Sequence, residues 1–244
     1  MRVLGIIPAR GGSKSIPRKN IKPFLGKPLL AWKIQAAQSS GVFDRIILST
    51  DDEEIAAIGR SFGAETPFLR PPELAQDSTP TLPVLQHAVA YLRDAEGYRP
   101  DVVVLLEPTT PGTQPFQIRE IVERFIETRA DSVISVVEVP SAYRPPWQFT
   151  MAEDGRLRLF TGEPINGIIR RRQDLPLTYH RNSALYVFRP GLLFTAAPSL
   201  YGGDVRGYVM DSRYSFDLDR PEDWAPAEEV MRSIVAESAG RATV

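Results

Sequence analysis

Residues 101–106 read DVVVLL, a continuous apolar run after one aspartate. A strand with one face in water alternates polar and apolar residues, whereas a strand covered on both faces can be apolar throughout. Both faces are covered mainly in sheets that are wholly or mostly parallel, because their crossover connections place helices on the two sides. The run therefore predicts a buried strand in an α/β fold, with helices flanking a mostly parallel sheet.

The rest of the chain supports this fold class, because short β-branched runs alternate with segments of helical periodicity. Short polar side chains predict two helix starts: Asp51-Asp52 should cap the second helix, and one residue of Asp77, Ser78 and Thr79 should cap the third. The expected strands are 2–7, 45–50, 101–106, 132–138, 184–188 and 207–211. The expected helices are 29–40, 53 to about 62, 81–95, 116–128 and a closing helix that begins near Pro221.

This periodicity fails between residues 140 and 181. Asp154-Gly155 predicts a hairpin between QFTMA and RLRLF, and much of the remainder is an arginine-rich loop that includes residues 170–172. The segment is too short to form its own core, so we interpret 140–181 as an irregular insert in a single domain that spans residues 1–236. Residues 237–244 are expected to form a flexible tail.

Composition excludes several classes of function. The 29 basic and 30 acidic side chains leave a net charge of -1, so no overall field attracts nucleic acid or an anionic membrane. The absence of cysteine excludes disulfides and thiol chemistry, and two histidines argue against a common zinc site. The first apolar run, VLGIIPA, lacks the pattern of a signal peptide, and no run reaches membrane-spanning length. We therefore expect a cytoplasmic protein with neither a membrane nor a nucleic-acid partner.

One loop concentrates positive charge directly after the first expected strand. Residues 8–20 read PARGGSKSIPRKN, which matches neither G-x-x-x-x-G-K-[ST] nor G-x-G-x-x-G. The backbone amides of Gly11, Gly12 and Ser13, together with nearby cations, could still hold a triphosphate. The alternative is a basic turn in solvent. The four cations of the loop are Arg10, Lys14, Arg18 and Lys19.

Two further polar loops should meet this one. Ligands of an open parallel sheet bind outside the carboxyl ends of its strands. The segments 8–20, 70–81 (RPPELAQDSTPT) and 107–113 (EPTTPGT) all fall at that edge by the expected strand order along the chain. Their convergence indicates a binding site.

Near the C-terminus, SFDLD places Asp217 and Asp219 two residues apart. In extended backbone such residues point the same way, so both carboxylates can face one hard cation such as Mg²⁺. The alternative is helix capping, for which Asp219 is well placed before Arg220-Pro221.

Seven of the segments together resemble the acylneuraminate cytidylyltransferase family, the CMP-sialic acid synthetases and the related enzymes that activate legionaminic and pseudaminic acids. The resemblance covers about residues 3–230. The segments, in family order, are IPARGGSKSIPRKNIKPFLGKPLLAW, FDRIILSTDDEEIA, LRPPELAQDSTPT, LLEPTTP, RRQDLP, RNSALYVF and SFDLDRPEDW.

The resemblance implies a Rossmann-like nucleotidyltransferase fold and transfer of CMP from CTP to the anomeric hydroxyl of a nonulosonic acid, with Mg²⁺ and release of pyrophosphate. It also implies a homodimer, in which the insert reaches the neighbouring subunit's site. On the nucleotide side, Arg10, Lys14 and Lys19 are expected to hold the triphosphate, Asn20 the ribose, and Arg70 and Thr81 the cytosine.

On the acceptor side, the resemblance implies that Arg172 and Gln173 meet the sugar acid, with Arg172 taking its carboxylate in cis or in trans. Asn182 would stand near the sugar. Asp217 and Asp219 would bind the metal. The residues expected to take part in catalysis are Arg10, Lys19, Asp217 and Asp219.

The chain departs from the family pattern at several positions. Glu107 replaces the usual glutamine and could accept a hydrogen bond from the cytosine amino group or add a metal ligand. Gly112-Thr113 replaces leucine-arginine, and Asn182-Ser183 replaces asparagine-glycine. Three other functions stay open: a CMP-Kdo synthetase, a transferase for another nucleotide and sugar on the same fold, and a nucleotide-binding protein without catalysis.

Overall fold

Strand β5 (Val102–Leu106) is buried along its whole length. It pairs in parallel with β1 (Val3–Pro8) on one side and antiparallel with β9 (Tyr179–Phe188) on the other. The structure is a computed structural model that describes residues 1–241. Its main sheet has the strand order β10-β6-β9-β5-β1-β4, in which only β9 runs antiparallel to its neighbours. The sheet is therefore mostly parallel, as the sequence predicts.

The remaining elements follow the expected alternation. The other strands of the main sheet are β4 (Arg45–Ser49), β6 (Ser132–Glu138) and β10 (Val205–Val209), and the short hairpin strands are β2 (Pro23–Phe24), β3 (Lys27–Pro28), β7 (Phe149–Met151) and β8 (Leu157–Leu159). The α-helices are α1 (Leu29–Ser40), α2 (Glu53–Ser61), α3 (Thr81–Glu96), α4 (Pro115–Thr128) and α5 (Trp224–Arg241).

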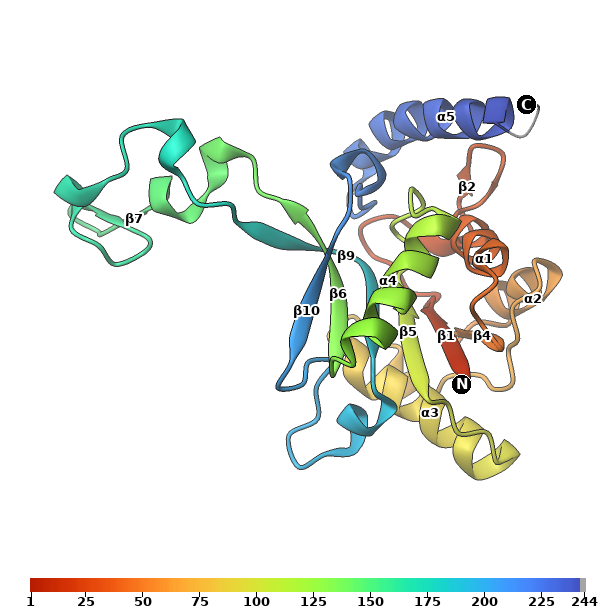
Figure 1. Cartoon of the computed structure of the whole chain (residues 1–244). Coiled ribbons are helices and arrows are strands. Elements are labelled where there is room, and N and C mark those ends of the chain that lie inside the picture. Colours follow the sequence, from red (N-terminus) through yellow and green to blue (C-terminus); the bar gives the residue numbers. More distant parts are fainter. Residues whose placement is uncertain (242–244) are drawn as a thin grey trace.

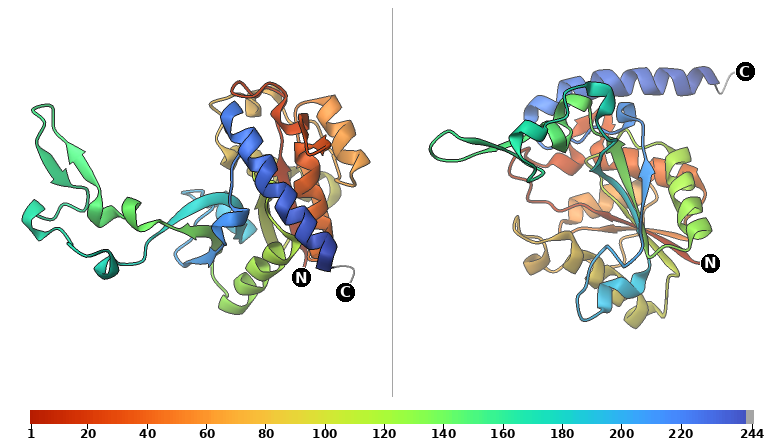
Figure 2. Two further views of the ribbon diagram at one scale, coloured as in Figure 1. Left: turned by 90° about the horizontal axis from the view of Figure 1, so that it is seen from above. Right: turned by 60° about the vertical axis from the view of Figure 1, so that its left-hand side comes forward.

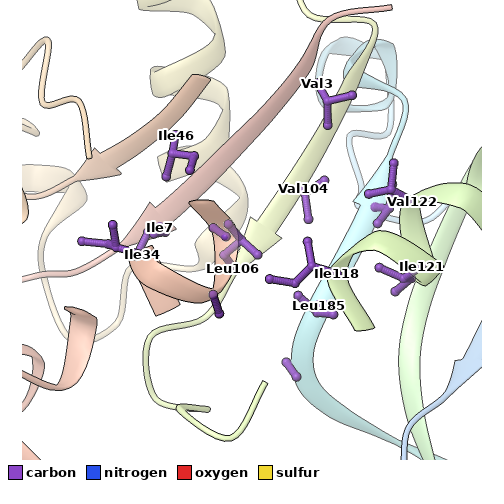
Figure 3. Close-up of a cluster of buried hydrophobic side chains, with 14 of the residues drawn as sticks. Val3, Ile7, Ile34, Ile46, Val104, Leu106, Ile118, Ile121, Val122 and Leu185 are labelled. Carbon is purple, nitrogen blue, oxygen red and sulfur yellow. The ribbon is translucent and has the colours of Figure 1, made fainter. Parts of the chain in front are cut away.

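Helices cover both faces of the sheet (Figure 1). On one face, apolar side chains of α1, α2 and α4 pack against β1, β4 and β5, and Figure 3 shows Ile34 and Ile118 of this cluster near Leu106. On the other face, Leu85 and Leu92 of α3 pack against the alternate residues of the same strands. Because β5 contributes to both clusters, its uninterrupted apolar sequence is explained.

A third apolar cluster lies under α5 and joins the two ends of the chain. Leu218 is fully buried in it with Phe24 and Trp224. Burial of Leu218 anchors the SFDLD segment, so that the residues on either side of it, Asp217 and Asp219, are held at fixed places.

The insert forms an arm between β6 and β9 that projects from the sheet (Figures 1 and 2). The β7–β8 hairpin lies in it, around Asp154-Gly155 as predicted. Several large apolar side chains of the arm are exposed in the single chain, although apolar groups favour burial. They include Tyr143, Met151, Phe160, Ile165 and Leu177.

One of the two predicted helix caps is confirmed. The Asp52 side chain accepts a hydrogen bond from the backbone N–H of Ile55 at the start of α2. The prediction for α3 is wrong, because this helix begins after Pro80, which caps it without a side-chain bond. Asp77 turns instead toward two cations of the basic loop.

Helix α5 includes residues 237–241, which the sequence assigns to a flexible tail, while residues 242–244 lie outside the described part of the chain. Within residues 1–241, no helix combines the length and the apolar character that crossing a membrane requires.

Gly112 yields a prediction about packing. A Cβ atom there would lie 2.6 Å from the Phe216 ring and 2.7 Å from the carbonyl oxygen of Tyr214, so a side chain must displace backbone. We expect Gly112→Ala to lower the free energy of unfolding by about 2 kcal/mol in urea titrations, as overpacked cores do. Gly167→Ala is the control, because a Cβ at Gly167 meets nothing within 4 Å. Equal stability of the two variants would contradict this account.

Candidate functional site

Three loops surround a cavity of about 430 Å³ at the carboxyl ends of the parallel strands. They are the basic loop after β1, the segment before α3, and the loop after β5. Their convergence, which the sequence predicts, is confirmed. The residues that line the cavity include Arg10, Ser13, Lys14, Lys19, Asn20, Arg70, Thr81, Glu107, Thr109 and Asp219.

Two cations of the basic loop pair with Asp77, which belongs to the segment before α3. Arg10 Nη1 lies 2.6 Å and Lys14 Nζ 2.5 Å from the two Asp77 carboxylate oxygens. These contacts lower the pKa of Asp77, chiefly through its hydrogen bond from Lys14. A carboxylate of the protein itself thus pairs with the cations that are expected to bind an anionic ligand.

The glycines of the basic loop serve close packing as well as ligand access. The Gly11 N–H donates to Asp51 Oδ1 at 3.0 Å, and the Ser13 N–H donates to the Gly11 carbonyl at 3.2 Å. A Cβ at Gly11 would lie 2.8 Å from Asp52 Oδ2, so glycine is required for this approach. Gly12 lines a neighbouring hollow with Ser13. In this conformation the amides of Gly11 and Ser13 are therefore engaged within the protein.

Lys19 joins the basic loop to the C-terminal acidic segment. Its ammonium group donates to the carbonyl oxygen of Leu218 at 2.8 Å and lies 3.2 Å from Asp219 Oδ1. The Lys19 side chain is only 12% exposed, whereas that of Asp219 is 69% exposed, so the bond to the Leu218 carbonyl is the better shielded of the two contacts. The predicted cation loop and the predicted acidic pair consequently form one site.

The two aspartates differ in their surroundings. Asp219 lines the cavity, whereas Asp217 lies deeper, and burial raises the pKa of its carboxyl group. Thr109 makes a hydrogen bond to Asp217, yet the Oδ1 atom of Asp217 is buried without a partner. The capping alternative for Asp219 is not observed, because Asp223 accepts the N–H groups at the start of the next turn.

A divalent cation fits this donor set. A buried carboxylate oxygen without a hydrogen-bond partner is costly unless a ligand completes it. Two carboxylates near each other also repel, and a hard cation relieves both effects. Within residues 1–241, no group of three or more acidic, histidine or cysteine side chains could hold a metal ion, so the protein would supply only part of the coordination of a cation here.

Asn20 and Arg70 are both buried in the wall of the cavity. The Asn20 amide donates to the Arg10 carbonyl at 3.0 Å, and its Oδ1 atom is buried without a partner. The Arg70 guanidinium bonds both the side chain and the carbonyl of Ser49, and burial lowers its pKa to about 10. Asn20 thus keeps a free acceptor for a ligand, while Arg70 also fixes the end of β4.

Glu107 lies where this cavity adjoins a second one. Burial, reinforced by the negative charge of Asp217, raises the pKa of Glu107 to about 7, while Lys33 opposes the shift. The second cavity has a volume of about 340 Å³ and shares only Thr81 and Glu107 with the first. The other residues of its wall are Leu82, Leu105, Arg181, Ser183, Tyr186, Leu200 and Tyr201.

The predicted acceptor residues do not lie in either cavity of the single chain. Arg172 and Gln173 form a short turn on the arm and are exposed. Asn182 is buried, and its amide group binds the Ser135 hydroxyl at 2.6 Å and the Met210 sulfur at 3.1 Å. Their roles toward an acceptor stay predictions.

Several residues of the site are not predicted from the sequence. Arg181, Tyr186 and Tyr201 line the second cavity, and Asp77 binds the basic loop. Tyr186 lies within an expected strand, where period-2 alternation places it on the α3 face, so its position could have been found. Tyr201 and Asp77 lie in irregular loops, whose side chains no periodicity orients.

Ser183 has φ of 57°, a left-handed conformation that glycine adopts more easily. This geometry explains why the family pattern has glycine at that position. The serine keeps the same backbone at some local strain.

Comparison with known proteins supports the same assignment. Residues 4–233 match the sequence model of the family described as cytidylyltransferase. The chain is 37% identical over 223 residues to a pseudaminic acid cytidylyltransferase of Campylobacter jejuni, covering 91% of this chain and 93% of that one. It is 32% identical to a CMP-N,N'-diacetyllegionaminic acid synthase of Legionella pneumophila, covering 95% and 97%.

The fold also matches that of a solved structure, CMP:2-keto-3-deoxy-manno-octonic acid synthetase complexed with CTP. The TM-score is 0.71 at 14% identity, with 96% of this chain and 99% of that chain covered. The family model spans nearly all of the residues that build the sheet, the basic loop and the acidic pair. The chain belongs to the cytidylyltransferase family.

Proposed function

We propose that the protein transfers CMP from CTP to the anomeric hydroxyl of a nonulosonic acid of the sialic, legionaminic or pseudaminic type and releases pyrophosphate. The observation that carries this proposal is the Lys19 contact, which unites a cation loop and a carboxylate pair at one cavity. Phosphoryl transfer needs both, because cations neutralise the leaving phosphates while carboxylates hold a metal. The activities named for the relatives favour the nonulosonate as acceptor.

On the nucleotide side, Arg10, Lys14 and Lys19 are proposed to bind the triphosphate. The amides of Gly11 and Ser13 would leave Asp51 Oδ1 and the Gly11 carbonyl to join that of Gly12 in the cradle. Entry of the phosphates would exchange Asp77 for a ligand oxygen on Arg10 and Lys14, so the cations change partners without losing neutralisation. Asn20 has an unpartnered buried Oδ1 atom and is suited to accept a ribose hydroxyl.

The cytosine is proposed to lie near Arg70 and Thr81, which line the same wall. Glu107 lines the same cavity and is one candidate to accept a hydrogen bond from the cytosine amino group. Its position at the junction of the two cavities also suits contact with the acceptor. As a carboxyl group with a pKa of about 7, it can offer either an acceptor or a donor at neutral pH.

The chemistry requires activation of a hydroxyl and stabilisation of the leaving group. A Mg²⁺ ion held by Asp217 and Asp219 would, when bound, supply Lewis acidity for the hydroxyl and the α-phosphate. Arg10 and Lys19 would neutralise charge that develops on pyrophosphate. Lys19, bonded to the Leu218 carbonyl, also fixes the Asp217–Asp219 segment against the basic loop.

We further propose that the protein is a homodimer and that the arm crosses to the partner. The exposed apolar side chains of the arm favour burial against another surface. Arg172 and Gln173, exposed on the arm, would then complete the acceptor site in trans, opposite the wall that contains Arg181 and Tyr186. Asn182 would support that wall from behind.

The function is tested by a product assay. CTP, GTP and UTP are each offered with sialic, legionaminic, pseudaminic and Kdo acids, and products are identified by mass spectrometry. We expect a CMP-nonulosonate to form with CTP and a nonulosonic acid, and no product with GTP or UTP. Preference for Kdo, or for another nucleotide with a sugar phosphate, would instead support a rival transferase. Binding of CTP without any product would indicate a non-catalytic protein.

Replacement of Asp217 tests the metal role. We expect Asp217→Asn to reduce kcat by about a hundredfold or more, equivalent to about 3 kcal/mol of barrier, because one metal ligand is lost. The measurement is pyrophosphate release at saturating Mg²⁺. Asp94→Asn is a matched control, since Asp94 pairs with Arg93 on the surface. Turnover near the wild-type rate would rule out this role for Asp217.

Mixed dimers test the arm. If Arg172 acts in trans, Arg172→Ala and Asp217→Asn chains are each inactive alone, but a heterodimer contains one intact site. Random exchange of subunits in a symmetric dimer should then restore about a quarter of wild-type activity. No recovery, despite heterodimers detected by native mass spectrometry, would place Arg172 in cis. A monomer by sedimentation would overturn the dimer itself.

A further inference from the structure

Lys33 is a buried cation that the proposed reaction leaves without a role. It lies on α1 and is 1% exposed, among the largest fully buried side chains of the protein. Its ammonium group donates to Thr110 Oγ1 at 2.9 Å and to Thr113 Oγ1 at 2.6 Å. Both partners belong to the loop that follows β5. A lysine is seldom retained in such a place unless its charge or its hydrogen bonds are needed.

The two threonines extend the contacts of Lys33 through the loop. The Thr110 hydroxyl donates to the carbonyl oxygen of Glu107 at 3.0 Å, and the Thr113 hydroxyl donates to the carbonyl oxygen of Thr110 at 3.1 Å. The ammonium group accordingly holds two hydroxyls that, in turn, hold the backbone. The same two carbonyl oxygens also accept the backbone N–H groups of Thr110 and Thr113, at the longer distance of 3.4 Å. The hydroxyl bonds therefore reinforce two weak backbone turns of residues 107–113.

The opposite side of the same loop faces the cavity. Glu107, Pro108 and Thr109 line the cavity wall. The Thr109 carbonyl accepts the N–H of Leu218 at 3.0 Å, and Thr109 also bonds the carboxylate of Asp217. A continuous series of contacts therefore runs from Lys33 through the loop to the acidic pair, although Lys33 touches no ligand position itself.

The charge of Lys33, like its hydrogen bonds, affects the residues on the cavity side of the loop. Its partners in hydrogen bonding are neutral hydroxyls, while Glu107 and Asp217 are the negative groups that act on it at longer range. Burial lowers the pKa of Lys33 to about 7 against the influence of those two carboxylates. A positive charge behind the loop favours the ionised carboxylates in front of it.

We propose that Lys33 is a positioning residue of the transfer site, which fixes the 107–113 loop so that Glu107 and Thr109 hold their places and Asp217 keeps its orientation. The expected effect of Lys33 on catalysis rests on the proposed function. The expected effect of Lys33 on the order of the loop does not, because that order can be measured without substrate. Lys33 thus differs in role from the cations of the basic loop, which are proposed to contact the phosphates directly.

Lys33→Met tests the proposal because methionine fills a similar volume without a donor. The loss of two buried hydrogen bonds lowers the stability of the variant, while removal of a costly buried charge raises it, so we expect only a small change in Tm. We expect kcat with the active nonulosonate to fall by about ten- to a hundredfold, the scale of a lost positioning contact, while KM for CTP changes by less than about threefold. Lys27→Met is the matched control, since Lys27 lies on the Trp32 ring outside the cavity and should retain wild-type kcat.

Thr113→Val tests whether Lys33 acts through the loop. The single variant should lose kcat to a smaller extent. The double variant Lys33→Met with Thr113→Val should be no slower than Lys33→Met alone, because residues in one network are not additive. Full additivity of the two losses would overturn the proposed route through Thr113.

Hydrogen exchange supplies the readout that is independent of activity. We expect faster amide exchange in Lys33→Met at the non-proline residues of 107–113 and at Leu218, with α3 unchanged. Wild-type exchange at these amides would overturn the positioning role, as would kcat within twofold of wild type in a protein that makes CMP-nonulosonates. A large loss of Tm with loss of CTP binding would show a general structural role instead. If the wild-type protein makes no CMP-nonulosonate, the proposed function fails, and the exchange data alone decide the role of Lys33.

Discussion

The parallel pairing of β4, β1 and β5 is the constraint on which the site depends. Parallel strands end at one edge, so the residues that follow each strand are brought together however far apart they lie in the sequence. Helices must cover both faces, which is why DVVVLL contains no polar residue between its aspartate and Glu107. The chain becomes polar at the point where the strand leaves the core. A buried strand and an exposed chemical loop are thus adjacent parts of one sequence.

Charge at this edge is balanced inside the protein. Arg10 and Lys14 bind Asp77, and Lys19 binds Asp219, so cations that are poised for phosphates already have carboxylate partners. Unpaired charges in a partly buried cavity would be costly, and a net charge of -1 for the chain leaves no excess to repel an anion. On the proposed function, binding of a triphosphate would exchange Asp77 for phosphate oxygens on Arg10 and Lys14.

Local patterns in the sequence predict the elements of the main sheet and all five α-helices, because apolar periodicity and turn residues act over short distances. They also predict the cavity, since the edge of a parallel sheet is a general property. They fail for Asp77, because the two cations that it meets lie over sixty residues earlier in the chain, where no local pattern connects them with it. The role of Lys33 is likewise invisible in sequence, where its helix reads as an ordinary apolar face with one lysine. Contacts between distant segments decide both cases.

The substitutions that set this chain apart from the family pattern are physically connected. Gly112 allows Tyr214 and Phe216 to pack directly on the loop after β5, and this packing holds the irregular SFDLD segment against Thr109. The Thr113 hydroxyl accepts a hydrogen bond from the buried ammonium group of Lys33. The charge of Lys33 lowers the pKa of Glu107 and so favours its ionised form. A glutamine at position 107 would carry no charge for Lys33 to stabilise. The acidic residue at the junction of the two cavities and the buried cation behind it therefore act on each other across the loop: the Lys33 charge lowers the pKa of Glu107, and the Glu107 charge raises the pKa of Lys33.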